Sequence, residues 1–131
     1  NKVLIDDYAH HPEELSALIS GVKSIFPNQK MVLVFQPHLY SRTQDQAAGF
    51  SATLDQADEV ILLPIYPARE LPIPGVTSDM LLAAMTIEKK QVMSKEQLMD
   101  WAASSEDKLI VMAGAGDIDV CINQIQEILT K

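Results

Sequence analysis

Short apolar runs rich in β-branched residues alternate with longer helical patterns along this chain of 131 residues. Residues 31–35 and 109–112 are strand-length runs without a polar side chain, which is typical of strands buried on both faces. Strands that alternate with helices favour a mostly parallel sheet covered by helices, with right-handed crossovers. The alternation therefore predicts one α/β domain in three layers, with helices on both faces of the sheet.

The same patterns place the other elements. We expect strands at residues 3–5, 31–35, 60–63, 91–93 and 109–112, the fourth being weak. We expect helices at residues 12–26, 41–54, 77–85, 94–102 and 118–128. Pro12 suits a first helical position, and Ser41 with Gln44 and Ser94 with Gln97 have the spacing of a capping box. Asp117 is a favourable cap for the last helix.

Composition excludes several classes of protein. With 47% hydrophobic and 21% charged residues, the chain can bury enough apolar surface to fold. Its net charge of -8 would repel a phosphate backbone, so nucleic-acid binding is disfavoured. One cysteine allows neither an intramolecular disulfide nor a cysteine-based zinc cage.

Location and completeness give two further expectations. No apolar run approaches the roughly 20 residues of a membrane span, and no secretory leader opens the sequence. We therefore expect a cytoplasmic protein. The sequence starts with Asn1 rather than methionine, so we expect it to be one domain of a longer protein.

The residues with chemical potential gather in the loops that follow the first three expected strands. These loops hold every histidine, tyrosine and arginine: His10, His11, His38, Tyr8, Tyr40, Tyr66, Arg42 and Arg69. Ligands of such sheets bind outside the carboxyl ends of the strands. Because arginine can hold a carboxylate or phosphate through two hydrogen bonds, this placement predicts a local anion-binding site on an acidic protein.

Structural roles compete with each of these assignments. The alternatives are a helix cap for Asp6 or Asp7, surface positions for His10 and His11, a backbone partner for His38, and ion pairs of Arg42 with Asp45 and Arg69 with Glu70. The Gly114–Gly116 turn lacks a full dinucleotide fingerprint and is more typical of close strand-to-helix packing. Trp101 and Cys121 fall at core positions of their helices. The proline-rich stretch 64–75 is either a plain surface loop or part of a functional edge.

The motifs in these loops resemble those of the C-terminal domain of the Mur ligases of peptidoglycan synthesis. The matching segments are residues 6–12 (DDYAHHP), 35–43 (FQPHLYSRT), 66–70 (YPARE) with 72–75 (PIPG), and 114–118 (GAGDI). The resemblance covers nearly the whole chain. It implies a Rossmann-like domain with a mixed sheet of about six strands, one of them antiparallel. It also implies that an N-terminal domain for the UDP-sugar and a central domain with the ATP P-loop are absent.

Within this family the motifs are similar to those of the members that add the first amino acid. The resemblance implies that ATP and Mg²⁺ serve the full-length enzyme, that UDP-N-acetylmuramate and L-alanine are its substrates, and that an acyl phosphate is formed between them. It further implies that this fragment alone is inactive and holds no tight metal ion.

The resemblance also implies roles for individual residues. Asp7 matches a residue at the nucleotide side of the cleft, and Tyr8, His38 and Arg42 match residues around L-alanine. His10 stands at a helix N-terminus, where a nucleotide phosphate could approach. Two positions depart from the family pattern: Leu39 stands where many relatives have arginine, and Ala9 stands where glycine is common. We therefore expect Arg42 to bind the alanine carboxylate without a second arginine.

Two other functions fit parts of the same pattern. A metal-dependent hydrolase could use Asp7, His10 and His38 as ligands. Against it, the adjacent His10 and His11 do not easily point at one ion, and the two arginines would repel a cation. A simple nucleotide-binding or interaction module is the other alternative.

Overall fold

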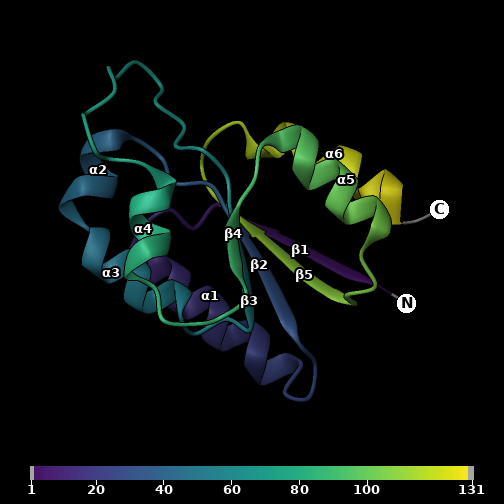
Figure 1. Cartoon of the computed structure of the whole chain (residues 1–131). Helices are drawn as coiled ribbons and strands as arrows, with labels where there is room; N and C mark the ends of the chain where they lie inside the picture. Colours follow the sequence, from purple (N-terminus) through teal and green to yellow (C-terminus); the bar gives the residue numbers. More distant parts are fainter. Residues whose placement is uncertain (1, 130–131) are drawn as a thin grey trace.

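A central sheet, whose strands alternate with helices along the chain, organises the molecule (Figure 1). The computed structural model describes residues 2–129. The strands are β1 (Val3–Asp7), β2 (Met31–Phe35), β3 (Glu59–Leu62), β4 (Lys90–Val92) and β5 (Leu109–Ala113). The helices are α1 (Pro12–Ile25), α2 (Tyr40–Asp45), α3 (Ala47–Leu54), α4 (Ser78–Ala84), α5 (Lys95–Ser104) and α6 (Ile118–Leu129). Every expected element is present, although one expected helix is divided into α2 and α3.

The strands are all parallel and lie in the order β1-β5-β2-β3-β4. Phe35 at the end of β2 is in register with Ala113 of β5 and with Leu62 of β3. Parallel strands in this register finish together, so the loops that follow them leave from one side of the sheet. We call the loops after β1, β2, β3 and β5 the carboxyl edge.

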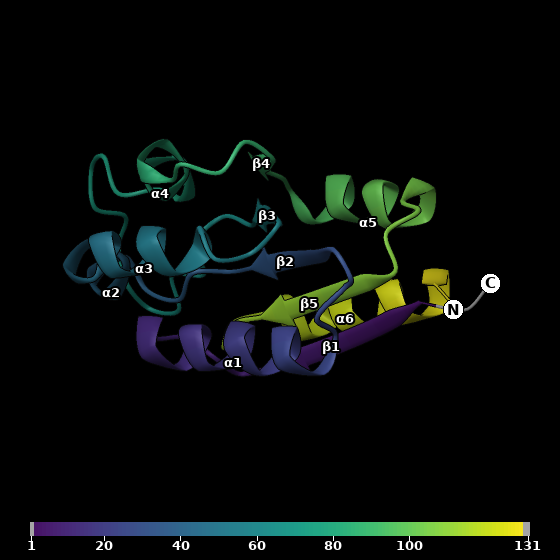
Figure 2. The same ribbon diagram turned by 90° about the horizontal axis from the view of Figure 1, so that it is seen from below.

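Helices cover both faces of the sheet and create two apolar cores. Helices α1, α3 and α4 lie on one face, and α5 and α6 lie on the other (Figures 1 and 2). Alternate residues of β2 serve the two cores: Met31, Leu33 and Phe35 pack on the first side, and Val32 and Val34 pack on the second. All residues of β2 and β5 are buried, which confirms the predicted two-sided burial. No helix in the described part of the chain has the length and apolarity needed to cross a membrane.

The strand count differs from the one that the family resemblance implied. The sheet has five parallel strands, and no antiparallel strand occurs within residues 2–129. The segment 63–77 between β3 and α4 contains four prolines, whose nitrogens cannot donate to a ladder. It makes one isolated parallel bridge, between Tyr66 and His38. The α/β class, the parallel sheet and the two helical layers are confirmed, whereas the antiparallel sixth strand is wrong for the described residues.

The two expected capping boxes have different outcomes. Ser94 precedes α5, its hydroxyl accepts from the Gln97 N–H at 3.1 Å, and its own N–H donates to Gln97 Oε1 at 2.8 Å. The box at Ser41 is wrong, because α2 already begins at Tyr40, after Leu39 with a φ of 71°. Ser41 therefore lies in the first turn of α2 and is not its cap. Its hydrogen-bond partner there is Glu70.

Candidate functional site

Two loops of the carboxyl edge are joined at His38 and Tyr66. The Tyr66 N–H donates to the carbonyl of Pro37 at 2.9 Å, and the Leu39 N–H donates to the carbonyl of Tyr66 at 2.8 Å. The rings of His38 and Tyr66 stack with centroids 5.6 Å apart and planes inclined by 18°. These contacts fix the spacing of the loops after β2 and β3.

Arg42 determines the tautomer of His38. Its Nη1 lies 3.1 Å from His38 Nδ1, and a guanidinium can only donate. His38 Nδ1 must therefore accept, which places the ring hydrogen of the neutral imidazole on Nε2. Burial lowers the pKa of His38 from its ordinary value, and the charges of Arg42 and His10 lower it further, against an opposing effect of Glu70. A neutral N–H donor beside a permanent cation suits a carboxylate ligand.

His10 has the opposite tautomer. Its Nδ1 lies 2.8 Å from the carbonyl oxygen of Tyr8. Because a carbonyl can only accept, Nδ1 carries the hydrogen and Nε2 of the neutral ring keeps its lone pair. The His10 ring meets the His38 ring edge-on, with centroids 6.2 Å apart and an angle of 89°. The structure thus brings two of the predicted site residues together from the loops after β1 and β2.

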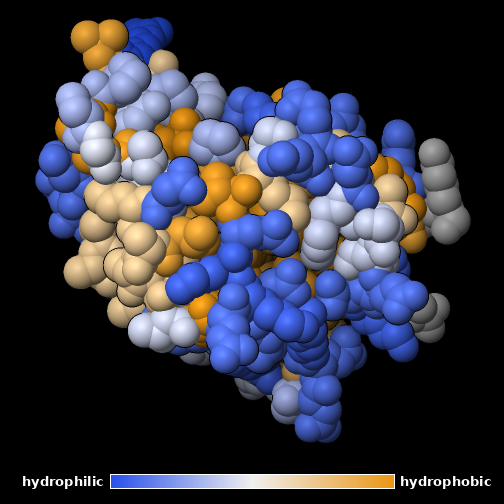
Figure 3. Space-filling model, viewed as in Figure 1, coloured by the Kyte–Doolittle hydropathy of each residue, from blue (hydrophilic) through white to orange (hydrophobic). Residues whose placement is uncertain are grey.

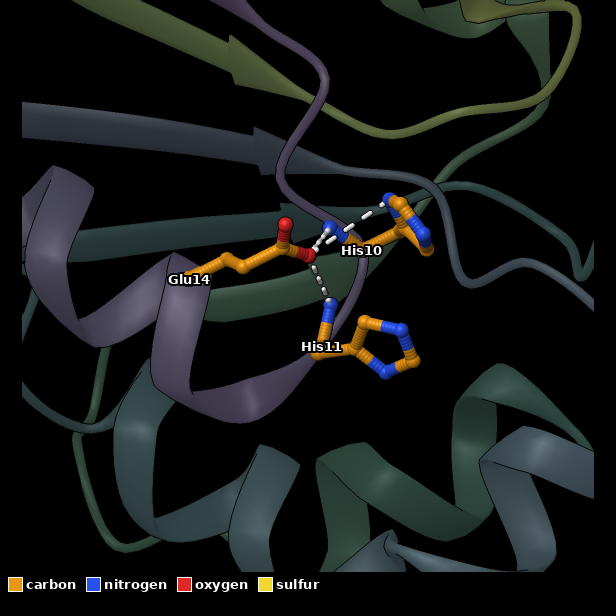
Figure 4. Close-up of side chains that lie close together, drawn as sticks. All are labelled: His10, His11 and Glu14. Carbon is orange, nitrogen blue, oxygen red and sulfur yellow. Dashed lines mark hydrogen bonds and ion pairs between the residues drawn. The ribbon is translucent and has the colours of Figure 1, made fainter.

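Glu14 stabilises the turn that carries His10 and His11 (Figure 4). Its Oε1 accepts from the N–H of His10 at 3.2 Å and from the N–H of His11 at 3.1 Å, and it lies 3.5 Å from His10 Nδ1. The hydrogen bond from the His10 backbone is the main cause that lowers the pKa of Glu14. As the third residue of α1, Glu14 satisfies N–H groups that the helix leaves without partners.

Glu70 binds a backbone N–H in the first turn of α2, although it lies 29 residues further along the sequence. Its carboxylate accepts the N–H of Ser41 at 3.0 Å and also the hydroxyl of Ser41. The hydroxyl and the N–H of Ser41 lower the pKa of Glu70. This contact attaches the proline-rich segment to the helix that carries Arg42.

The buried side chain of Gln36 connects the end of β2 to the start of α6. Its Oε1 accepts from the Ile118 N–H at 2.9 Å, and its Nε2 donates to Asp117 Oδ1 at 2.7 Å. Asp117 also pairs with Lys95 of α5. Burial would raise the pKa of Asp117, but the hydrogen bonds from Lys95 and Gln36 outweigh it and lower the pKa. Asp117 directly precedes α6, but its carboxylate binds Gln36 and Lys95, and the Ile118 N–H bonds to Gln36 instead of to the predicted cap.

The turn between β5 and α6 approaches Tyr66 closely. A Cβ atom added to Gly116 would lie 2.7 Å from Gln36 Oε1 and from two carbon atoms of Tyr66. Only glycine fits here without a shift, because real Cβ atoms do not come this close to other atoms. The Gly114–Gly116 turn therefore supports tight packing, which agrees with its structural interpretation.

Two hollows adjoin this part of the carboxyl edge. One of about 290 Å³ is bordered by Gln36, Pro64, Ile65, Tyr66, Pro67, Ser94, Lys95, Glu96 and Asp117. Another of about 200 Å³ lies between Tyr40, Pro64, Ile65, the start of α4 and Val92. On the face drawn in Figure 3, apolar surface gathers between α4 and α5 near these strand ends. A larger hollow of about 510 Å³ lies at the amino ends of the strands, where ligands of parallel sheets do not normally bind.

Other predicted residues lie outside the His10–His38–Arg42 group. The Tyr8 hydroxyl donates to Asp119 of α6 at 3.1 Å, and Tyr8 is 65% exposed. Asp7 Oδ1 accepts from the Ala9 N–H at 2.8 Å, so Asp7 forms a local turn and does not cap α1.

Both arginine ion pairs that we considered are absent within residues 2–129. Arg42 contacts His38 instead of Asp45, and the Glu70 carboxylate binds Ser41 instead of Arg69. Arg69 is exposed. Of the two arginines of the carboxyl edge, Arg42 therefore belongs to the group with His10 and His38, and Arg69 faces solvent. Cys121 is buried, and Trp101 packs half-buried against the second core, as predicted.

The possible metal ligands form a different group from the one expected. In residues 2–129, the one trio with ligand atoms within 4.8 Å of each other is His10, His11 and Glu14. The expectation that the adjacent histidines do not easily point at one ion is thus wrong, since their ligand atoms lie within 4.8 Å of each other. Glu14 and His10 already have the partners described above, however. Neither Asp7 nor His38 belongs to the trio, so the ligand set of the hydrolase hypothesis does not form.

Sequence reasoning missed the roles of Gln36, Ser41 and Glu70. Gln36 could have been noticed as a polar residue directly after a fully apolar strand in the sheet interior. Ser41 and Glu70 are 29 residues apart, and no spacing rule connects residues at that distance.

Comparisons with known proteins give a consistent result. Residues 1–116 match the family described as Mur ligase, glutamate ligase domain. The UDP-N-acetylmuramate–L-alanine ligase of Parabacteroides distasonis is 50% identical over 129 residues, which cover 98% of this chain and 28% of that protein. The ligase of the same name from Flavobacterium johnsoniae is 47% identical over 129 residues, covering 98% of this chain and 29% of the relative.

Solved structures agree in fold. The UDP-N-acetylmuramate-alanine ligase of Thermotoga maritima superposes with a TM-score of 0.76 at 27% identity, over 97% of this chain and 26% of that one. A murein peptide ligase from Psychrobacter arcticus has a TM-score of 0.73 at 19% identity, over 96% of this chain and 27% of that one, which shows a shared fold. The chain therefore spans less than a third of the length of these relatives.

Proposed function

The chain belongs to the Mur ligase family as its C-terminal domain, and we propose that the whole protein joins L-alanine to UDP-N-acetylmuramate with ATP. ATP phosphorylates the lactyl carboxylate of UDP-N-acetylmuramate. The amino group of L-alanine attacks the acyl phosphate, and inorganic phosphate leaves. Relatives with 50% and 47% identity carry the name of this activity, which supports the assignment.

The pairing of Arg42 with His38 is the observation that carries the proposal. Arg42 supplies a permanent charge and several N–H donors, and His38 supplies a neutral Nε2–H next to it. Together they can bind the carboxylate of an amino acid and leave its amino group free to react. Fixing the substrate in this way lowers the entropic part of the barrier.

We propose roles for the remaining residues in the complete enzyme. Although Tyr8 and Asp7 lie outside the His10–His38–Arg42 group here, Tyr8 would limit the space around the alanine methyl group, and Asp7 would lie on the nucleotide side. His10 lies between the nucleotide side and His38, since it precedes α1 and its ring contacts His38. Leu39 carries no charge, so Arg42 is the arginine that holds the carboxylate.

Mg²⁺ and the P-loop belong to other parts of the full-length enzyme. The described residues do not fit a magnesium ion, which prefers clustered oxygen ligands, because their single trio contains two imidazoles. We therefore propose that the isolated chain is inactive and that the UDP-sugar domain and the ATP domain of the same protein complete the site. We place this reaction in the cytoplasm.

Phosphate release by the full-length enzyme tests the proposal. With ATP, Mg²⁺ and UDP-N-acetylmuramate present, L-alanine should stimulate phosphate release. Glycine and L-serine, tested in place of L-alanine, measure the preference for the amino acid. The Arg42→Ala, His38→Ala double variant should lose this stimulation, while Arg69→Ala, which alters an exposed arginine of the same edge, should keep it. Retained ligation in the double variant would reject the assignment of the amino-acid site.

A further inference from the structure

We propose that His10 is a catalytic residue that accepts a proton at Nε2 from the amino group of the incoming amino acid. This inference rests on the proposed ligase function and deepens it. An α-ammonium group is not a nucleophile until it loses a proton, so the reaction needs an acceptor near the amino group.

The hydrogen-bond partners of His10 leave one nitrogen available as that acceptor. The Tyr8 carbonyl holds the hydrogen of the neutral ring on Nδ1 over 2.8 Å. The lone pair is then on Nε2, and this second nitrogen points away from Glu14 (Figure 4). The side chain of His10 is 29% exposed, so a substrate can reach it.

His10 and His38 are complementary in a way that matches a zwitterion. His38 presents a hydrogen on its Nε2 because Arg42 occupies its Nδ1, whereas His10 presents a lone pair on its own Nε2. The His38 ring can thus donate to a ligand and the His10 ring can accept from it. The two rings meet edge-on with centroids 6.2 Å apart. An amino acid needs donors for its carboxylate and an acceptor for its ammonium group.

A carboxylate lies beside the His10 ring, on the side of Nδ1. Glu14 Oε1 lies 3.5 Å from His10 Nδ1 and would stabilise the imidazolium. His11, on the same turn, and His38 are the neighbouring imidazoles, and Arg42, which is bonded to His38, is the cation of the group. Burial, followed by the charges of Arg42 and His10, lowers the pKa of His38, which suits His38 to the role of a neutral donor.

Two proton transfers accompany the formation of the amide bond. An N–H bond of the ammonium group breaks, its electron pair stays on nitrogen, and the proton moves to His10 Nε2. The nitrogen forms a bond to the carbonyl carbon of the acyl phosphate, and the bond from that carbon to the phosphate oxygen breaks. The departing phosphate takes the second proton of the nitrogen, and His10 later returns its proton to water.

Two nucleophiles separate this role from nucleotide binding. Hydroxylamine is largely uncharged at neutral pH and traps an acyl phosphate as a hydroxamate without needing a base. In the full-length enzyme, His10→Gln should reduce kcat/KM for L-alanine by about 100-fold or more. Hydroxamate formation with ATP and UDP-N-acetylmuramate should be unchanged, and the deficit with L-alanine should shrink as the pH rises. His11→Gln is the matched control, because His11 occupies the next position of the same turn, and it should keep both activities.

Each other result overturns the inference. Equal loss of hydroxamate and alanine ligation in His10→Gln would assign His10 to the nucleotide or to folding, and unchanged alanine ligation would show that no base is needed there. If the unaltered enzyme releases no phosphate in response to L-alanine, the proposed function fails and this inference fails with it.

Discussion

The guanidinium of Arg42 donates to Nδ1 of His38 across 3.1 Å, although the two residues belong to different local structures. His38 ends the extended segment after β2, and Arg42 lies inside α2. The unusual backbone of Leu39 between them, with φ of 71°, turns the chain so that both side chains meet. The charge and the ring therefore act as one unit.

Replacing Arg42 by lysine should weaken this unit while keeping its charge. Lysine donates from a single nitrogen and lacks the planar fork, so it is less able to hold His38 and a carboxylate together. Hydrogen bonds to charged groups contribute about 1.5–3 kcal/mol, so we expect KM for L-alanine to rise about 10- to 100-fold. Initial rates of phosphate release in the full-length enzyme measure the effect. Arg69→Lys is the control, and an unchanged KM in Arg42→Lys would contradict the proposed contact with substrate.

Protonation of His38 should destabilise the folded chain. Burial, followed by the charges of Arg42 and His10, holds the pKa of His38 below its ordinary 6.5. The unfolded chain then binds more protons just below this pH, so the free energy of unfolding falls as the pH decreases through the folded-state pKa. Urea unfolding between about pH 7.5 and 5 should show a smaller decline for His38→Gln than for the unaltered chain. Identical declines would mean that His38 titrates normally.

Glu70 and Ser41 should be energetically coupled. Glu70→Ala leaves the Ser41 N–H at the start of α2 without its acceptor, and Ser41→Ala removes one of the two hydrogen bonds. We expect each single variant to lower the urea midpoint and the double variant to be less destabilised than the sum of the two. Glu96→Ala, which removes an exposed carboxylate elsewhere in the chain, is the control for the loss of a surface charge. Strict additivity of the two changes would show that the contact does not stabilise α2.

Gly116→Ala should disturb the site through Tyr66. The added methyl group would sit 2.7 Å from Gln36 and Tyr66, and such overpacking typically costs about 1–3 kcal/mol. Gly21→Ala is the matched control: nothing lies within 4 Å of its added Cβ, and alanine inside a helix should stabilise the chain by about 0.5–1 kcal/mol. Thermal or urea unfolding of both variants measures the contrast. Equal effects would contradict the close approach.

Most of the fold could be predicted because its determinants are local. The apolar runs at β2 and β5 specify buried strands, and Ser94 with Gln97 starts α5 through side chains three residues apart. The Ser41 pattern failed because the spacing of a capping box does not decide where a helix begins. In the first turn of α2, the Ser41 N–H bonds to Glu70, which is 29 residues away.

The grouping of the candidate-site residues was predictable, but their contacts were not. A parallel sheet places its loops on one edge, so the gathering of His10, His38 and Arg42 followed from their positions after strands. The exposure of Arg69 and the tautomers of the two histidines depend on single hydrogen bonds between loops. Those bonds join residues from separate parts of the chain, and no local pattern encodes them.

The amide of Gln36 has a mechanical consequence for the whole domain. The loop after β2 leads into the layer of α1, α3 and α4, whereas Ile118 begins a helix of the opposite layer. The side chain of Gln36 belongs to this loop and hydrogen-bonds to Asp117 and Ile118, so a force that displaces the loop would also shift the start of α6. A neighbouring domain that presses on one layer would therefore be felt in the other.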